Sequence, residues 1–205
     1  MAIDDHHVDP VLPLEIKFII LQMALKSDMR DAKNLLFISK DVFDWLIPIL
    51  YNAVVLTSYE PHAWPPLPLP IAKLPQYGRY VQHLFAISTP ETVLDQYLEH
   101  CPNIVDLASW DQFSQSQIRS IVRLPLSQLI LSSDAATSMP LTPPTLKLFP
   151  KITHLSIEGL DTSFVSHFPA LTHLVFDEYI DFTGWMEVFE QYLKLKVLIS
   201  GPFGL

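Results

Sequence analysis

The chain contains a single cysteine, Cys101, which directly follows His100. A thiol beside an imidazole could form a Cys–His nucleophile, but in such pairs the base meets the thiol in space and a third group orients it. Sequence neighbours at a helix end seldom face each other in that way, and a free cysteine is commonly a small buried apolar residue. We therefore predict that Cys101 packs in the core and does not act as a nucleophile.

Three histidines stand at one position of a recurring phrase, directly before its second leucine. In a parallel-strand repeat this side chain points away from the core, onto the concave face, and His154 and His173 would lie on neighbouring strands about 5 Å apart. A zinc site needs three or four ligands, so this pair does not predict a metal centre. Their protonation near pH 6 would favour an acidic partner. The equivalent positions form either a solvated face or a substrate-recognition face: His83, Asp106, Gln128, His154 and His173.

Composition excludes several classes of protein. The chain has 205 residues, of which 49% are hydrophobic, so it forms one medium or two small folded domains. Its formal net charge of −9 argues against nucleic acid and against anionic membranes as partners. No segment is apolar for the roughly 18 residues of a membrane helix, and the acidic N-terminus is unlike a secretory signal. One cysteine and no glycosylation sequon predict the cytoplasm or nucleus.

No further site chemistry emerges from the sequence. The chain has five glycines and no glycine-rich phosphate loop, and two of these glycines lie in the terminal GPFGL. Carboxylate pairs such as Asp4–Asp5 and Asp177–Glu178 have no spacing that demands catalysis. We therefore expect no catalytic residue, no metal and no cofactor.

From residue 80 onward an apolar-x-x-Leu phrase recurs six times. FPKITHL and FPALTHL, which begin at Phe149 and Phe168, are near duplicates nineteen residues apart. Helical candidates follow most phrases, at residues 90–100, 114–124, 142–149, 161–168 and 182–193, and Ser116 offers a start signal for the second. A strand and helix of this length must stack on neighbours to bury their apolar faces. The segment AVVL, with Ala53/Leu56, offers a seventh phrase. The six anchor pairs are Val81/Leu84, Ile104/Leu107, Leu126/Leu129, Ile152/Leu155, Leu171/Leu174 and Leu195/Leu198.

This region resembles a leucine-rich-repeat array over roughly residues 80–200. The frame L-x-x-L-x-L is fully met in the repeats that begin at Leu126, Ile152 and Leu171. The asparagine that the family places five residues after the second anchor is missing, which argues against a regular horseshoe. The resemblance implies an irregular, helix-rich arc of about six parallel strands. Because only SGPFGL follows the last phrase, either the final strand edge is exposed or the natural protein continues.

The first fifty residues have a helical pattern. On a helical wheel, Ile16, Ile20 and Met23 gather on one side of residues 14–26, and Phe18 and Leu21 gather on the other. A bundle of this size has little interior for a second apolar face, so a partner protein could cover it. The helical spacing resumes over residues 34–50, where Pro48 should kink or end the helix. Residues 58–75 contain six prolines and are predicted to form a surface loop.

The N-terminal segment is similar to the F-box family, in its fungal form, over about residues 10–56. The matching residues follow L-P-x-E-[IL], an apolar helix, and then L-x-x-V-[SC]-[KR]-x-[WF]. The resemblance implies a three-helix unit that docks on the Skp adaptor of a cullin–RING ubiquitin ligase. Which residues face the adaptor and which face the core stays open, with the Ile16/Ile20 side favoured for docking. The positions carried over are Leu12, Pro13, Ile16, Ile20, Leu35, Ile38 and Val42.

These observations predict an α/β chain in three parts. Residues 10–52 form an F-box-like helical domain, residues 53–79 a strand and a Pro-rich connecting loop, and residues 80–205 a leucine-rich-repeat-like solenoid. The resemblances imply a non-catalytic substrate-recognition subunit of an SCF-type E3 ubiquitin ligase, with a protein substrate on the repeat arc. One alternative is a leucine-rich-repeat interaction scaffold without a ligase role. A less favoured one is an enzyme with a site on the concave face.

Overall fold

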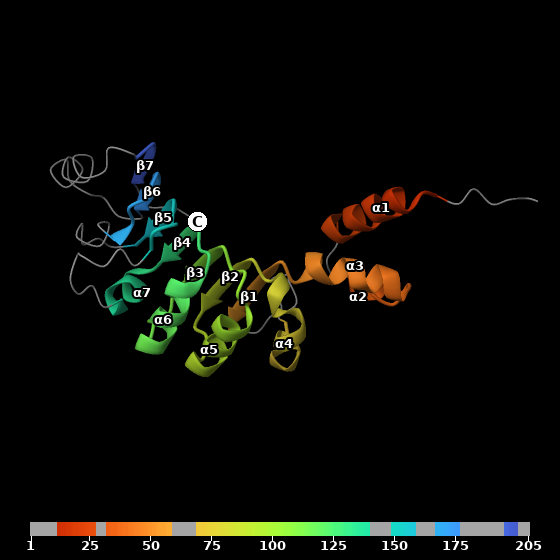
Figure 1. Ribbon diagram of the computed structural model, residues 1–205, viewed down its shortest axis with the longest axis horizontal. Coiled ribbons are helices and arrows are strands. Elements are labelled where there is room, and N and C mark those ends of the chain that lie inside the picture. The colour runs from red at the N-terminus through yellow and green to blue at the C-terminus, as the bar shows by residue number, and fades with distance from the viewer. Residues whose placement is uncertain are drawn as a thin grey trace, which may run out of the picture. The chain divides into compact units, whose positions relative to one another are not determined.

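The computed structural model describes residues 12–27, 32–58, 69–139, 149–158, 167–176 and 195–200. The chain divides into two compact units, Met1–Leu46 and Ile47–Leu205. The described part of the first unit is helical, and the second is built on a parallel sheet (Figure 1). The predicted α/β class, with helices followed by alternating strands and helices, is confirmed at this level.

The described residues of the first unit contain α1 (Leu14–Ser27), α2 (Ala32–Leu35) and the start of α3 (Lys40–Leu50), which continues into the second unit. Pro13 precedes α1, where a missing N–H costs no helical hydrogen bond. Its carbonyl accepts hydrogen bonds from the amides of Ile16 and Lys17, both at 3.1 Å. Phe18 of α1 stacks on Trp45 of α3, with ring centroids 4.5 Å apart. One side of α1 is therefore packed within its own unit.

The helical run predicted over residues 34–50 is interrupted. The Ser39 hydroxyl accepts a hydrogen bond from the Val42 amide at 3.2 Å, which caps a new helix and separates α3 from α2. At the other end, α3 continues through Pro48 to Leu50 and does not end at the proline. A proline so close to the C-terminus removes only one backbone donor, and only two residues follow it in the helix.

The second unit contains a parallel sheet whose strands follow one another in chain order. All six predicted phrases form strands, and AVVL forms another at the start of the sheet. Each strand pairs in parallel with the next, as a solenoid of strand–helix units requires. The strands are β1 (Ala53–Thr57), β2 (His83–Ile87), β3 (Asp106–Ser109), β4 (Gln128–Leu131), β5 (His154–Ile157), β6 (His173–Phe176) and β7 (Val197–Ser200).

The second anchors of the repeats form one continuous row across the sheet. Leu84, Leu107, Leu129, Leu155 and Leu174 lie opposite one another in register, and all five are buried. We call this set, which Leu198 extends in β7, the leucine row.

The anchors expected in β1 were wrong by two residues. Val54, not Leu56, pairs with Leu84 of the leucine row, and Leu56 pairs with Ala86. Alternation is consistent with this register, because Val54 and Leu56 both face the core, whereas Ala53, the first residue of the strand, is exposed.

Helices cover one face of the sheet: α5 (Glu91–His100), α6 (Gln115–Arg123) and α7 (Ser133–Ser138) (Figure 1). The predicted helices at α5 and α6 are confirmed, but α6 begins after Ser114 and not at Ser116. Ser114 and Gln117 form a reciprocal capping box that fixes this start. Helix α7 was not predicted, and Ser132 caps it by accepting from the Ala135 amide. Helices expected in residues 142–149, 161–168 and 182–193 lie largely or wholly outside the described residues.

The second half of the Pro-rich segment is not the surface loop that was predicted. Residues 71–80 form three short helical turns, η1 (Ile71–Lys73), α4 (Leu74–Tyr77) and η2 (Gly78–Tyr80). Pro75 is tolerated because it lies in the first turn of α4, where its missing N–H has no partner to lose. Leu69 and Leu74 are buried, and the Tyr97 hydroxyl donates a hydrogen bond to the Leu69 carbonyl. Residues 59–68 lie outside the described residues.

Gly78 allows this segment to approach the end of α5, and we expect Gly78→Ala to destabilise the chain. An added Cβ would lie 2.4 Å from the His100 carbonyl oxygen, which is backbone and cannot turn away. Overpacking of this kind typically costs about 1–3 kcal/mol of unfolding free energy. Urea unfolding measures the loss, with exposed Gln76→Ala as the control in the same segment. Equal stability of the two variants would contradict the close approach.

Candidate functional site

The sheet has an open face, which we define as the face opposite α5, α6 and α7. The polar column predicted from the sequence lies on it, because its residues alternate with the buried leucine row. Register places the members directly opposite one another on successive strands, and none of them is buried: His83, Asp106, Gln128, His154 and His173.

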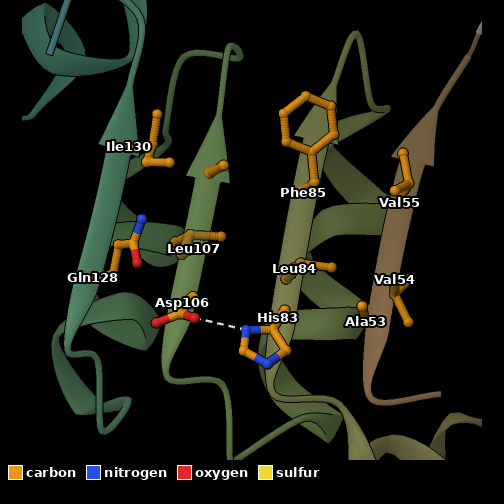
Figure 2. A pocket seen from close by; sticks show the side chains of 11 residues that line it. Ala53, Val54, Val55, His83, Leu84, Phe85, Asp106, Leu107, Gln128 and Ile130 are labelled. Atoms are coloured by element: carbon orange, nitrogen blue, oxygen red, sulfur yellow. Dashed lines mark hydrogen bonds and ion pairs between the residues drawn. The ribbon is translucent and has the colours of Figure 1, made fainter. Parts of the chain in front are cut away.

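His83 and Asp106 form an ion pair on neighbouring strands. The distance from His83 Nδ1 to Asp106 Oδ2 is 2.6 Å, and the two side chains are 44% and 31% exposed (Figure 2). The other carboxylate oxygen of Asp106 accepts a hydrogen bond from the Ser127 hydroxyl at 3.2 Å. Such an exposed pair contributes little to stability. It does hold both side chains in place, and together with Ser127 it gives each oxygen of the Asp106 carboxylate a hydrogen-bond partner.

A ladder of hydroxyl groups precedes the polar column in the later repeats. Ser127 donates to the Val105 carbonyl at 3.3 Å, and Thr153 donates to the Ser127 carbonyl at 3.3 Å. Thr172 continues the ladder by donating to the Thr153 carbonyl at 3.1 Å. The Thr153 and Thr172 hydroxyl protons are therefore directed to the backbone of the preceding repeat, whereas the single Ser127 proton is shared between the Val105 carbonyl and the Asp106 carboxylate.

Two hydroxyl groups of the ladder also contact histidines of the polar column. Thr153 Oγ1 lies 2.8 Å from His154 Nδ1, and Thr172 Oγ1 lies 2.8 Å from His173 Nδ1. Because both hydroxyl protons go to carbonyls, we assign the proton in each contact to the imidazole nitrogen, which donates to the hydroxyl oxygen. Nε2 of each ring is then the nitrogen that can take up a proton or meet a ligand.

His154 and His173 stack on each other, with ring centroids 4.1 Å apart and planes inclined by 8°. Partial desolvation and then the neighbouring charges of His154 and Lys196 lower the pKa of His173 from its usual value. A metal ion lies near the plane of each imidazole that binds it, so two parallel rings do not converge on one ion. The described residues contain no group of three or more His, Cys, Asp or Glu side chains that could hold a metal.

An apolar row lies beside the polar column on β1 to β4. Val55, Phe85, Ala108 and Ile130 are opposite one another in register, and all are half-buried. They help to line a hollow of about 160 Å³ that also touches His83, Asp106 and Gln128 (Figure 2). This row was not predicted from the sequence. The signal that could have identified it is an apolar residue two positions after the polar-column position in four strands, where a solvated sheet face would carry a polar residue.

Trp110 extends the apolar surface beyond the end of β3. Its indole ring packs at a tilt against the Phe85 ring, with centroids 5.0 Å apart, and 40% of the residue remains exposed. The open face thus changes character along the sheet, from apolar at β1 to β4 to histidine-rich at β5 and β6.

Cys101 is fully buried at the end of α5, as predicted. Burial raises the pKa of its thiol to about 12, so the thiol stays protonated at neutral pH. His100 does not activate it, because His100 Nδ1 lies 3.0 Å from the Gln96 carbonyl and donates there. A nucleophilic role for this cysteine is inconsistent with both observations.

In the first unit, the residues carried over from the F-box pattern differ in exposure. Leu12, Pro13, Ile16, Ile20 and Ile38 are exposed, whereas Leu35 and Val42 are half-buried. The exposed side chains on α1 form what we call the apolar stripe, which is 42–66% exposed and comprises Ile16, Ile19, Ile20 and Met23.

The opposite side of α1 carries Phe18 and Leu21, which are half-buried, as the helical wheel predicts. Phe37, in the turn after α2, is 86% exposed and was not among the predicted contact residues. Its large apolar ring beside the predicted Ile38 was the signal that could have identified it.

Searches of family models, of curated proteins and of solved structures gave no match to this chain. None of the helices in the described ranges is long and apolar enough to cross a membrane.

We expect the pKa of His173 to lie below the usual histidine value of 6.5. The substitution His154→Gln should raise the pKa of His173, because it removes one of the charges that oppose protonation. A pKa lowered by folding means that this histidine's contribution to stability is full above pH 6.5 and declines as the pH falls toward the folded-state pKa. NMR titration of the imidazole protons measures both shifts. His83→Gln, at the other end of the sheet, is the control. A His173 pKa that does not respond to His154→Gln would contradict the stacked geometry.

We also expect the Cys101 thiol to resist modification in the folded chain, because it is buried and protonated. Ellman's reagent at pH 8 should label it at least 100-fold more slowly in buffer than in 6 M guanidinium, on the order of the protection a core site receives. Rapid labelling of the folded chain would show that the site is open.

Proposed function

We propose that this chain is the substrate-recognition subunit of an SCF-type cullin–RING E3 ubiquitin ligase. The helices of the first unit would dock on the Skp adaptor, and the open face of the repeat sheet would hold a protein substrate. Ubiquitin transfer would then be accelerated by proximity, since the bound substrate is held near a thioester that this chain does not carry.

The observation that carries this proposal is the apolar stripe of α1. Ile16, Ile20 and Met23 stand at i, i+4 and i+7, which is the spacing by which a helix enters an apolar groove of a partner. The opposite side of the helix already packs through Phe18 on Trp45, so the stripe is a second apolar face. A contiguous exposed patch of this kind on a small helical unit is typical of a protein-interaction site.

The stripe also coincides with the F-box resemblance. Ile16 and Ile20 are anchors of that pattern, and they are 42% and 51% exposed. Leu12 and Ile38, two further anchors, are exposed as well. An F-box followed by leucine-rich repeats is a common order in that family, so the parallel repeat sheet supports the same reading.

The proposal is tested by co-purification with a Skp adaptor. We expect the wild-type chain to form a stoichiometric complex, and Ile16→Asp to weaken it by roughly 100-fold, as charges at the centre of an apolar interface do. Lys17→Asp is the matched control, because Lys17 is exposed on the same helix outside the stripe. Circular dichroism checks that both variants remain folded.

Absence of a complex between the wild-type chain and the adaptor at micromolar concentrations would refute the ligase role. The alternative of a leucine-rich-repeat scaffold without a ligase role would then replace it. Equal loss of binding in Ile16→Asp and Lys17→Asp would show that the stripe is not the docking surface.

A further inference from the structure

The apolar end of the open face can accept a large side chain from outside the sheet. Val55, Phe85 and Ile130 present half-buried apolar groups to the hollow, and the helices lie on the other side of the strands (Figure 2). Trp110 adds a further exposed aromatic surface against Phe85. Contact with an aliphatic or aromatic side chain would remove this surface from water, which is the main source of affinity at such a site.

The histidine end of the open face has the opposite chemistry. Asp106 is engaged by His83 Nδ1 at 2.6 Å, three strands away from the outer histidine of the stacked pair, and Gln128 on β4 is neutral. Among the described residues that face the stacked pair, the remaining ionisable groups are His154, His173 and Lys196, all of which are basic. Glu158 lies at the other end of β5. Within a chain of formal net charge −9, this is a local site for negative charge.

The hydroxyl ladder determines which nitrogen of each stacked imidazole is open to a ligand. Because Nδ1 of His154 and of His173 is tied to a threonine hydroxyl, a proton taken up at Nε2 creates an N–H donor next to the equivalent donor of its neighbour. Two parallel donors of this kind suit the two oxygens of a carboxylate. Without a negative ligand, protonation of one ring opposes protonation of the other.

The two ends are separated by a distance that an extended chain spans easily. The hollow is centred on β2 and β3 and the stacked pair lies on β5 and β6, so they are three strand spacings, or about 14 Å, apart. An extended peptide advances about 3.3 Å per residue, so about four residues connect the two ends.

We propose that the open face binds an extended segment of the substrate that crosses the strands, with one large apolar side chain in the hollow and acidic residues about four positions away against His154 and His173. This inference rests on the proposed role of the sheet as the substrate face and adds the chemistry of the segment it recognises. Complex formation takes up protons at the stacked pair, so binding tightens as the pH falls.

The test is a fluorescence anisotropy titration of the full chain, without adaptor, at pH 7.5 and pH 6.0. The probe is a fluorescein-labelled peptide in which three Gly/Ser residues separate a phenylalanine from two consecutive aspartates. We expect binding to be at least about fivefold tighter at pH 6.0, because more protons are available there and a bound carboxylate stabilises the charged form of the two stacked imidazoles. Two control peptides replace the aspartates by lysines or the phenylalanine by alanine, and both should bind at least about tenfold more weakly at pH 6.0.

Variants separate the two ends of the site. Replacing both histidines, as His154→Gln with His173→Gln, should abolish the pH dependence, and Phe85→Ser should weaken binding at both pH values. His100→Gln, which lies on α5 and away from the open face, is the control and should bind as the wild type does. Circular dichroism confirms folding of each variant.

The proposal is overturned if the wild type does not bind the aspartate peptide at pH 6.0, or if it binds the lysine peptide equally well. It is also overturned if the double histidine variant keeps the pH dependence. Because the titration contains no Skp adaptor, such a failure leaves the docking of α1 untouched. Conversely, loss of adaptor binding with retained peptide binding would refute the ligase role alone.

Discussion

The leucine row is the constraint on which the rest of the second unit depends. Side chains alternate between the two faces of a strand, so a shift of one residue in the pairing of any strand would expose its leucine and bury its polar neighbour. Register instead places a buried leucine opposite a buried leucine from β2 to β6. The polar column therefore faces outward as a consequence of core packing, and its members become neighbours whatever their chemistry.

Equivalent positions in successive repeats bring like side chains together. The near-duplicate phrases place Phe149 and Phe168 in a buried stack, with ring centroids 5.2 Å apart, and His154 and His173 in an exposed one. The first stack adds apolar contact to the core. The second brings two titratable groups close enough to influence each other, as the lowered pKa of His173 reflects. One repeat pattern thus gives stability on one face and pH-sensitive chemistry on the other.

The strands and the outward column could be predicted from the sequence because both follow from the two-residue alternation of a strand. Local hydrogen bonds decided what could not be predicted. Ser39 divides a continuous helical pattern, and Ser114 moves the start of α6, although a neighbouring serine was an equally plausible cap. The helical turns of residues 71–80 depend on contacts that this segment makes with Tyr97 and the end of α5, which lie about twenty to thirty residues away in the chain. Composition alone, with its many prolines, indicates a loop there.

The two candidate sites also differ in how far the sequence predicts them. The apolar stripe was predictable because a helical wheel separates the two faces of α1, and Phe18 fixes which face is packed inside. The apolar row on the open face escaped prediction because it becomes a surface only when four strands align. Taken singly, Val55, Phe85 and Ile130 are ordinary strand residues. Once their strands align, they line a hollow that the His83–Asp106 pair borders. Exposed apolar area of this kind is unfavourable in water, so the stripe on α1 and the hollow on the open face are the surfaces where burial against another molecule would gain the most free energy.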